Sequence, residues 1–153
     1  MTPADITREA LTWIGVPFKW QGRSRRGLDC GGLPAVVGSA LGLFQGPLEP
    51  PRYRPTLPHG YLIKELGKRL IERPGARKSG CGNGAPDCCP ECLESFAGCV
   101  VVLGILGAHC GIVTDDGRIV SVGDAAGVHA APFTADALRL LRAAFEFPGI
   151  TYR

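Results

Sequence analysis

The stretch from residue 15 to residue 33, GVPFKWQGRSRRGLDCGGL, constrains the fold most strongly because it places Cys30 immediately before a Gly-Gly pair. Small residues at this point let backbone amides approach the thiol closely. Apolar residues then recur at the spacing of an amphipathic helix, at Leu33, Val36, Val37, Ala40 and Leu41. The pattern predicts a helix that begins at the cysteine and holds Pro34 in its first turn.

A cysteine at the start of a helix is suited to covalent catalysis. The helix dipole stabilises negative charge there, and the thiolate, not the thiol, is the nucleophilic form. We therefore interpret Cys30 as a nucleophile. Asp29, directly before it, can either cap the helix or pair with a substrate amine, and we favour capping.

A cysteine nucleophile needs a base, and the chain contains three histidines, His59, His109 and His129. His59 lies in the proline-rich segment that includes residues 55–58, and this segment indicates a loop. His109 lies between apolar runs that are typical of β-strands. A lone histidine on a strand is more often structural than catalytic, so it is the presence of Cys30 that favours His109 as the base.

The residues around His109 predict a β-hairpin. An apolar run at 99–106 precedes the histidine, and a second one at 111–113 follows it. Asp115-Asp116-Gly117 is a turn signal before residues 118–122, a second strand-like segment. Such a hairpin would hold His109 on a rigid support.

Further elements can be predicted at both ends of the chain. Thr2 and Pro3 indicate a helix start, with Thr2 as N-cap. A second helix is expected from Tyr61 to about Glu72, and a short one after Thr134 that carries Leu138 and Leu141. Residues 143–147 favour a final strand.

Composition limits the classes of protein to be considered. With 153 residues, 45% of them hydrophobic, and a net charge of +3, the chain suits one globular domain over residues 1–153. The charge is too small to indicate nucleic-acid binding. We find no apolar stretch long enough to span a membrane and no signal-peptide pattern at the start, so synthesis in the cytosol is expected.

These motifs together resemble the NlpC family of cell-wall cysteine peptidases, and within it the branch associated with tail tips of phages and gene-transfer agents. The resemblance lies in AHCGIVTDDGRIVSV and in residues 13–17, 29–33, 49–53 and 144–148. It implies a papain-like α+β fold in which N-terminal helices pack on a small antiparallel sheet. Residues 76–97 have no counterpart in the family and are interpreted as a Cys-rich loop insertion.

The resemblance also assigns catalytic roles. Cys30 would be the nucleophile and His109 the general base that later protonates the leaving amine. The family usually places a polar residue, often histidine, where this chain has Ser121. A serine hydroxyl carries no charge, so the reaction would be slowed but not abolished. Ser121 as a passive strand residue is an equally good interpretation.

Substrate binding is expected near the same loop. The family commonly has hydroxyl-bearing residues where this chain has Phe18 and Gly31. Asp29, Arg23 and Arg25 complete the expected binding set. The arginines, with the neighbouring third one at position 26, would lower the thiol pKa and attract carboxylates of peptidoglycan stem peptides. The alternative is an ordinary solvated loop.

A second unusual feature is a cluster of four cysteines within SGCGNGAPDCCPEC: Cys81, Cys88, Cys89 and Cys92. Four thiols in a turn-prone segment can bind zinc or an iron-sulfur cluster, and the spacing does not separate the two. Cys99 could replace one of the four. Disulfides formed after export, or free thiols, are the alternative.

The functional hypothesis is a phage tail-tip cysteine peptidase that hydrolyses peptide bonds of bacterial peptidoglycan during infection or DNA entry, with no cofactor needed for catalysis. Its partners would be peptidoglycan and other tail-tip or hub proteins. It would be assembled into the virion tail in the host cytoplasm and act on the wall in the periplasm. The alternative is a structural tail-hub component with a vestigial site and a metal-stapled loop. A free bacterial amidase or acyltransferase on the same fold is a third hypothesis.

Overall fold

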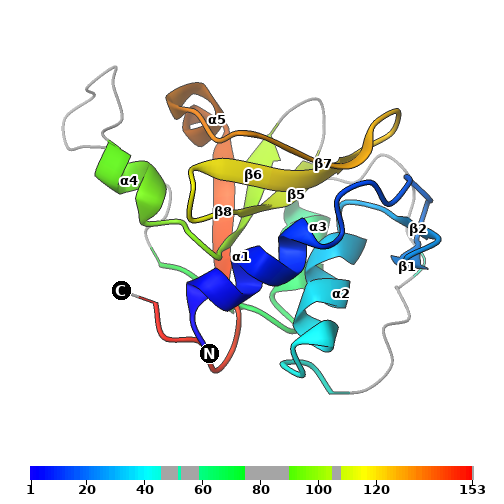
Figure 1. The fold of residues 1–153 in the computed structure, drawn as a ribbon. Helices are drawn as coiled ribbons and strands as arrows, with labels where there is room; N and C mark the ends of the chain where they lie inside the picture. The colour runs from blue at the N-terminus through cyan, green and yellow to red at the C-terminus, as the bar shows by residue number, and fades with distance from the viewer. Residues whose placement is uncertain (46–51, 53–58, 75–89, 105–107, 153) are drawn as a thin grey trace.

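The computed structural model describes residues 1–45, 52, 59–74, 90–104 and 108–152. Its centre is a six-stranded antiparallel sheet with the strand order β3-β8-β4-β5-β6-β7 (Figure 1). The strands are β3 (Ile71–Glu72), β4 (Val100–Gly104), β5 (Ala108–Val113), β6 (Arg118–Gly123), β7 (Gly127–Pro132) and β8 (Leu141–Glu146). Sequence neighbours β4 to β7 pair in succession, and β8 returns to pair with β4.

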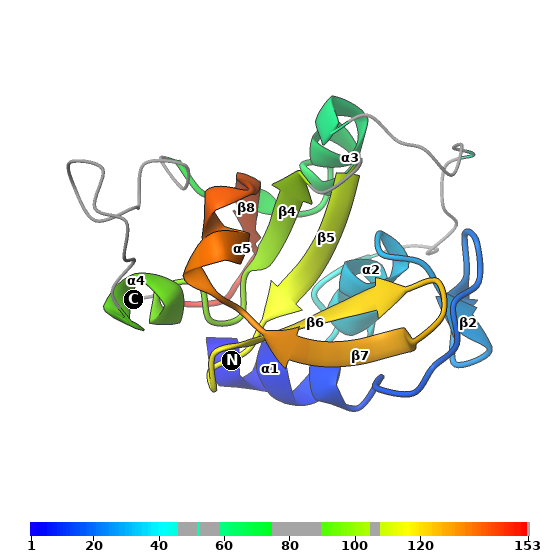
Figure 2. The same ribbon diagram turned by 90° about the horizontal axis from the view of Figure 1, so that it is seen from above.

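Helices cover both faces of this sheet (Figure 2). The elements on one face are α1 (Pro3–Leu11), α2 (Gly32–Ala40) and α3 (His59–Leu66), and those on the other are α4 (Pro90–Glu94) and α5 (Ala135–Arg139). Alternate side chains of a strand point to opposite faces. Val100 and Val102 accordingly belong to the core under α1 to α3, whereas Val101 and Leu103 belong to the core under α4 and α5. The predicted α+β architecture, with N-terminal helices on an antiparallel sheet, is confirmed.

Helix α2 begins where its sequence pattern predicts. Its first residue is Gly32, and Pro34 lies in the first turn, where a missing backbone N–H costs nothing. Leu33, Val36 and Val37 are buried against the sheet. The helix therefore presents its first turn, and the cysteine just before it, to the sheet.

The N-terminal helix is also as predicted, with Thr2 as N-cap and Pro3 at its start. The Asp5 carboxylate accepts hydrogen bonds from the Thr2 backbone N–H at 2.8 Å and from its hydroxyl at 3.2 Å. The first bond satisfies the backbone N–H of Thr2, which has no partner within the helix itself.

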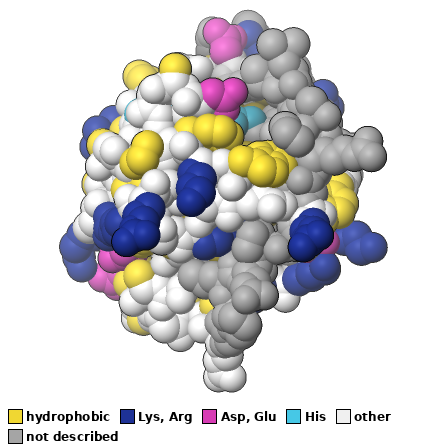
Figure 3. Space-filling model, turned by 90° about the vertical axis from the view of Figure 1, so that its right-hand side faces the viewer, with side chains coloured by type: hydrophobic (Ala, Val, Ile, Leu, Met, Phe, Trp, Pro, Cys, Tyr) yellow, Lys and Arg dark blue, Asp and Glu magenta, His cyan; other side chains and the backbone are white. Residues whose placement is uncertain are grey.

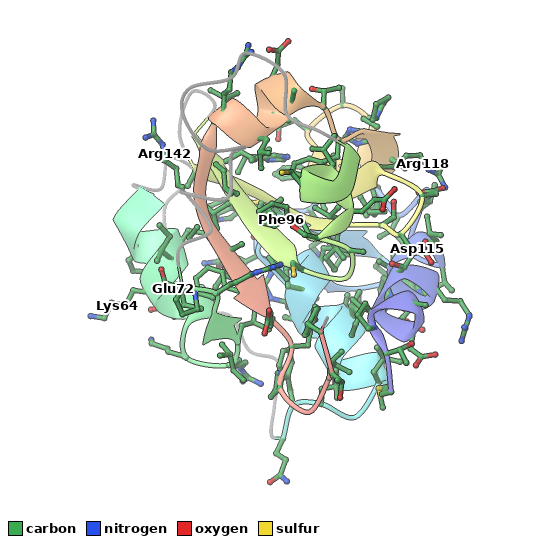
Figure 4. The ribbon with its side chains drawn as sticks, turned by 90° about the vertical axis from the view of Figure 1, so that its left-hand side faces the viewer. Lys64, Glu72, Phe96, Asp115, Arg118 and Arg142 are labelled. Carbon is green, nitrogen blue, oxygen red and sulfur yellow. The ribbon has the colours of Figure 1, made fainter. Side chains whose placement is uncertain are left out.

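The predicted hairpin is formed by β5 and β6. Thr114 N–H donates to the Arg118 carbonyl at 2.8 Å, and Gly117 has a φ of +77°, which favours glycine. Asp115 and Arg118 lie close to each other at this end of the sheet (Figure 4). The hairpin places His109 second in β5, opposite Leu103 of β4.

Two parts of the sequence fold differently from the expectation. The helix expected from Tyr61 to about Glu72 ends at Leu66, because residues 71–72 pair with β8 as an edge strand. Leu141, expected in the last helix, instead begins β8. In both places long-range strand pairing outweighs local helix propensity.

Strands β1 (Arg23–Ser24), β2 (Gly27–Leu28) and β7 were not predicted. The first two form a short hairpin in the loop before Cys30. β7 pairs with β6 along its full length, and its first residue, Gly127, has a φ of +65°. The local sequence here is rich in glycine and alanine, so only pairing with β6 defines the strand.

The second core lies beneath α4 and α5. Phe96 is fully buried there and meets Phe133 edge-to-face, with ring centroids 6.2 Å apart. Figure 4 shows Phe96 in the interior beside α4, whereas Lys64 and Glu72 lie at the periphery. None of the described helices is long and apolar enough to cross a membrane.

The cysteine-rich segment falls mostly outside the described residues. Cys81, Cys88 and Cys89 belong to that undescribed part, and so does most of the expected insertion at 76–97. Cys92 is described and lies on α4. The boundaries of an insertion therefore stay a prediction.

Candidate active site

Cys30 lies between β2 and α2, with Gly31 as the N-cap residue of the helix. Its side chain is half-buried and packs against the core under α1 to α3. Because α2 contacts β5, the start of the helix faces the strand that carries His109.

Asp29 holds this junction together. Its carboxylate is 2% exposed and accepts from the backbone N–H of Gly32 at 2.8 Å and of Gln21 at 2.9 Å. Arg23 donates to the same carboxylate at 2.8 Å. The bond from Gly32, the first residue of α2, agrees with the favoured capping role, although the N-cap residue is Gly31. The bonds of Asp29 fix the loop, and with it Cys30, at the helix start.

The Cys30 thiol meets two side chains from the beginning of β5. Hydrogen bonding with Cys110 and then with His109, together with the charge of His109, lowers the pKa of Cys30 to about 5, although burial and the charge of Asp29 oppose this. At neutral pH the Cys30 sulfur is therefore a thiolate beside the His109 side chain, the pairing that activates a cysteine nucleophile.

Cys110 is the residue that sequence reasoning missed. Strand alternation predicts that it is buried on the face opposite His109, and it is fully buried. It belongs with Cys30 to the core under α1 to α3, and its Sγ donates to the Cys30 carbonyl at 3.0 Å, so Cys110 is a member of the site. Its hydrogen bond with Cys30 and its burial raise the pKa of Cys110 well above its usual range. The adjacent position of a second thiol, directly after His109, was the available signal.

The arginines near the cysteine contact protein groups. Arg23 pairs with Asp29, and its side chain is 13% exposed. Arg25 lies over the Trp13 ring, 3.7 Å from the centroid, and donates to the carbonyl of Thr12 at the end of α1. The lowered pKa of Cys30 arises mainly from Cys110 and His109, so the expectation that the arginines lower it is wrong. Their role in binding substrate stays a prediction.

Ser121 occupies β6 opposite Gly111, two positions along β5 from His109. It is 5% exposed, and no hydrogen bond joins it to the imidazole within the described part of the chain. On the β7 side of β6, Ser121 lies opposite His129. The Nδ1 of His129 is 3.0 Å from the Gly127 carbonyl. Its role as a third catalytic residue stays a prediction.

Phe18 is close to the cysteine in the fold. Its backbone forms an isolated bridge with Leu28, two residues before Cys30, and its side chain is 36% exposed. The phenyl ring can donate no hydrogen bond, and its role in binding substrate stays a prediction. His59 begins α3, not a loop as expected.

On the face that Figure 3 shows, lysine and arginine side chains lie in several separate places.

The described residues contain no group of three or more side chains arranged to hold a metal ion. Cys99, considered as a substitute ligand, is fully buried in the second core, and burial raises its pKa to about 11. Its sulfur instead lies 3.9 Å from the Arg73 guanidinium. The predicted metal site has three of its four cysteines outside the described residues and stays a prediction.

Comparison with solved structures places this architecture in a known class. No protein-family model matches the sequence, and no curated protein matches it. The NlpC/p60 domain of the peptidoglycan hydrolase SagA aligns over 95% of this chain and 99% of its own length, with a TM-score of 0.56 and 17% identity. An NlpC/p60 family protein from Bacillus cereus aligns over 96% of this chain but 40% of its own, with a TM-score of 0.60 and 16% identity.

The fold is therefore papain-like α+β. More particularly, it is the fold of NlpC/p60 domains, as the resemblance in sequence implies. An NLP/p60 family lipoprotein-like structure from Staphylococcus aureus is similar too, with a TM-score of 0.52 and 17% identity over 95% of this chain and 41% of its own.

Proposed function

We propose that the chain is a cysteine peptidase of the NlpC type that hydrolyses peptide bonds of bacterial peptidoglycan. The observation that carries the proposal is the Cys30 thiol beside the start of α2, with its pKa lowered by Cys110 and His109, on a fold shared with NlpC/p60 domains. A similar solved domain is named as part of a peptidoglycan hydrolase, which indicates the class of substrate.

In this mechanism the Cys30 thiolate attacks the amide carbonyl and forms an acyl-enzyme. His109, as the imidazolium, protonates the leaving amine and then activates the water that releases the acyl group. The backbone N–H of Gly32 already donates to Asp29, so the candidate oxyanion donors are the N–H groups of Cys30 and Gly31. Asp29 acts as a positioning residue through its bonds to the loop and the helix.

The setting of this activity is proposed to be a phage tail tip, where the peptidase would open the wall during DNA entry. The support is the sequence resemblance to the tail-associated branch of the family. Partners would then be peptidoglycan and neighbouring tail or hub proteins.

A structural tail-hub role is the second candidate. It is favoured by Ser121, which gives the imidazole no charged partner, and by Phe18 and Gly31, which lack the hydroxyls common in the family. In that case the Cys30–His109 pair would be the remnant of an active site, and the cysteine-rich segment would bind metal to fasten an interface.

Zymography on purified peptidoglycan separates these candidates. The wild type and Arg26→Ala, an exposed change on the same loop, are expected to clear the substrate, whereas Cys30→Ala and His109→Ala are expected to lose activity. Mass spectrometry of the released fragments identifies the bond that is cut. Equal inactivity of all four folded proteins would support the structural role instead.

A further inference from the structure

The two thiols at the site are packed against each other from distant parts of the chain. Cys110 Sγ donates to the carbonyl oxygen of Cys30 at 3.0 Å, across 80 positions of sequence. Packing of the loop before α2 on β5 therefore creates a dithiol pair.

The contact brings the sulfur of Cys110 next to the backbone of Cys30. A disulfide requires Cα atoms about 4.4–6.8 Å apart and thiols that face each other. The Cys30 carbonyl oxygen lies two bonds from its Cα, so the Cys110 sulfur, in contact with that oxygen, is already next to the Cys30 backbone. Formation of an S–S bond needs side-chain rotation, not the approach of two distant segments.

We propose that Cys30 and Cys110 are a redox-active pair that a hydroperoxide converts to a disulfide, so that the nucleophile carries a reversible oxidative modification site. This inference goes beyond the proposed peptidase function. Its direct readout is the oxidation state of the two sulfurs, which does not depend on any peptidase activity.

The environments of the two thiols indicate which one reacts with the peroxide. Cys30 is half-buried, and its hydrogen bonds favour the thiolate that attacks peroxides. Cys110 is fully buried and keeps its proton. Cys30 is thus the sulfur that a peroxide reaches, and Cys110 is the buried sulfur beside it that attacks in the second step.

The reaction balances with one hydroperoxide for each pair. The Cys30 thiolate attacks the terminal oxygen of the hydroperoxide, the O–O bond breaks, and the remainder leaves as water or an alcohol after taking a proton. The Cys110 sulfur then attacks the resulting sulfenic sulfur; the S–S bond forms, and the hydroxyl leaves as water with the thiol proton. The two thiols lose two electrons in total, and the hydroperoxide gains them.

Cys99 shows why Cys110 is suited to this role. It is also buried, but it belongs to the core on the other face of the sheet and lies beside Arg73. Among the described cysteines, Cys110 is the one whose thiol contacts Cys30. Cys99 therefore offers a matched control for a buried thiol outside the site.

The experiment exposes the reduced full-length chain to hydrogen peroxide, blocks remaining thiols with N-ethylmaleimide, and maps peptides by mass spectrometry. The expected product is a linked peptide that joins Cys30 to Cys110, lighter by two hydrogens than the two reduced peptides. Dithiothreitol should remove the link and restore both free thiols. The Cys99→Ala variant should form the same linked peptide.

Variants at the second thiol complete the test. Cys110→Ala and Cys110→Ser should lose the link completely, accumulate a Cys30 sulfenic acid that reacts with dimedone, and proceed to sulfinic acid that dithiothreitol does not reverse. Cys110→Ser keeps a hydroxyl donor at this position, and circular dichroism checks that it is folded. The proposal is overturned if wild-type Cys30 reaches sulfinic acid as fast as in Cys110→Ser, or if it links to a different cysteine.

Discussion

At the scale of single residues, the charge of Cys30 is set by its immediate neighbours. Hydrogen bonds from Cys110 and His109 stabilise the thiolate more than burial destabilises it, and the pKa falls to about 5. The helix start contributes in the same direction, since partial positive charge gathers at an N-terminus. Asp29 and Arg23 hold the backbone in place, and both side chains are largely buried.

The first prediction concerns this ionisation. Because the pKa of Cys30 is lowered, its reactivity should be present throughout the neutral range and be lost as pH falls through about 5. Cys110→Ala removes the largest stabilising contact, so the midpoint should rise, whereas Cys99→Ala should leave it unchanged. The measurement is the rate of alkylation of Cys30 by iodoacetamide against pH, followed by peptide mapping. A wild-type midpoint near the value of about 8.5 of a free cysteine would contradict the prediction.

The second prediction concerns Asp29. Asp29→Asn removes the charge that Arg23 and two backbone N–H groups bind in a buried place, so we expect the free energy of unfolding to fall by about 3 kcal/mol. Urea unfolding followed by circular dichroism measures this change. Asp136→Asn is the control, because its carboxylate is 85% exposed and its ion pair with Arg139 should contribute about 0.5 kcal/mol at most. Equal effects of the two substitutions would show that the Asp29 bonds do not anchor the loop.

At the scale of elements, the loop before Cys30 is attached to the end of α1. Arg25 donates to the carbonyl and hydroxyl of Thr12, which is the C-cap residue of that helix, and lies over the Trp13 ring. A guanidinium at a helix C-terminus meets partial negative charge there. The β1–β2 hairpin, helix α1 and the start of α2 are thereby joined around the cysteine.

The third prediction follows from this attachment. Arg25→Ala should lower the free energy of unfolding by about 1 kcal/mol through loss of the cation–π contact and the helix-end hydrogen bonds. Arg26→Ala, on the same loop, should have no measurable effect on stability. Thermal unfolding of the two variants gives the comparison. If Arg25→Ala raises KM for peptidoglycan fragments with stability unchanged, the guanidinium binds substrate instead.

At the scale of the whole molecule, one sheet serves two cores with different roles. The core under α1 to α3 supports Cys30 and Cys110, whereas the core under α4 and α5 contains Phe96, Cys99 and Phe133. Tyr152 joins the C-terminal segment to this second core, since its hydroxyl donates to the Gly98 carbonyl at 3.1 Å and accepts from the Phe147 backbone N–H at the same distance. The site therefore lies on one side of the sheet, and α4, which carries Cys92, lies on the other.

The fourth prediction concerns the cysteine-rich segment and rests on sequence alone. We expect one zinc ion or one iron-sulfur cluster for each chain, bound by Cys81, Cys88, Cys89 and Cys92. Elemental analysis and an absorption spectrum of anaerobically purified protein distinguish the two, since a cluster is coloured and zinc is not. Serine substitution of Cys88 should release the metal, while Cys99→Ala should retain it. Metal-free protein with four alkylatable thiols in the segment would contradict the expectation.

Local sequence patterns were enough to predict several features of this protein. The helix start at Cys30, the capped helix after Thr2, and the β5–β6 hairpin after His109 depend on neighbours a few residues away, and each forms where its pattern predicts. Capping residues, apolar periodicity and turn residues act over these short distances.

Other features depend on distant parts of the chain, so they emerge only when the whole chain packs. Strands β3 and β7 exist because β8 and β6 supply their hydrogen-bond partners, and no local pattern encodes that pairing. In the same way, alternation along β5 predicts which face Cys110 occupies, but not that the loop before α2 brings Cys30 to that face. The chemistry of the nucleophile therefore depends on a contact that forms only when helix and sheet pack together.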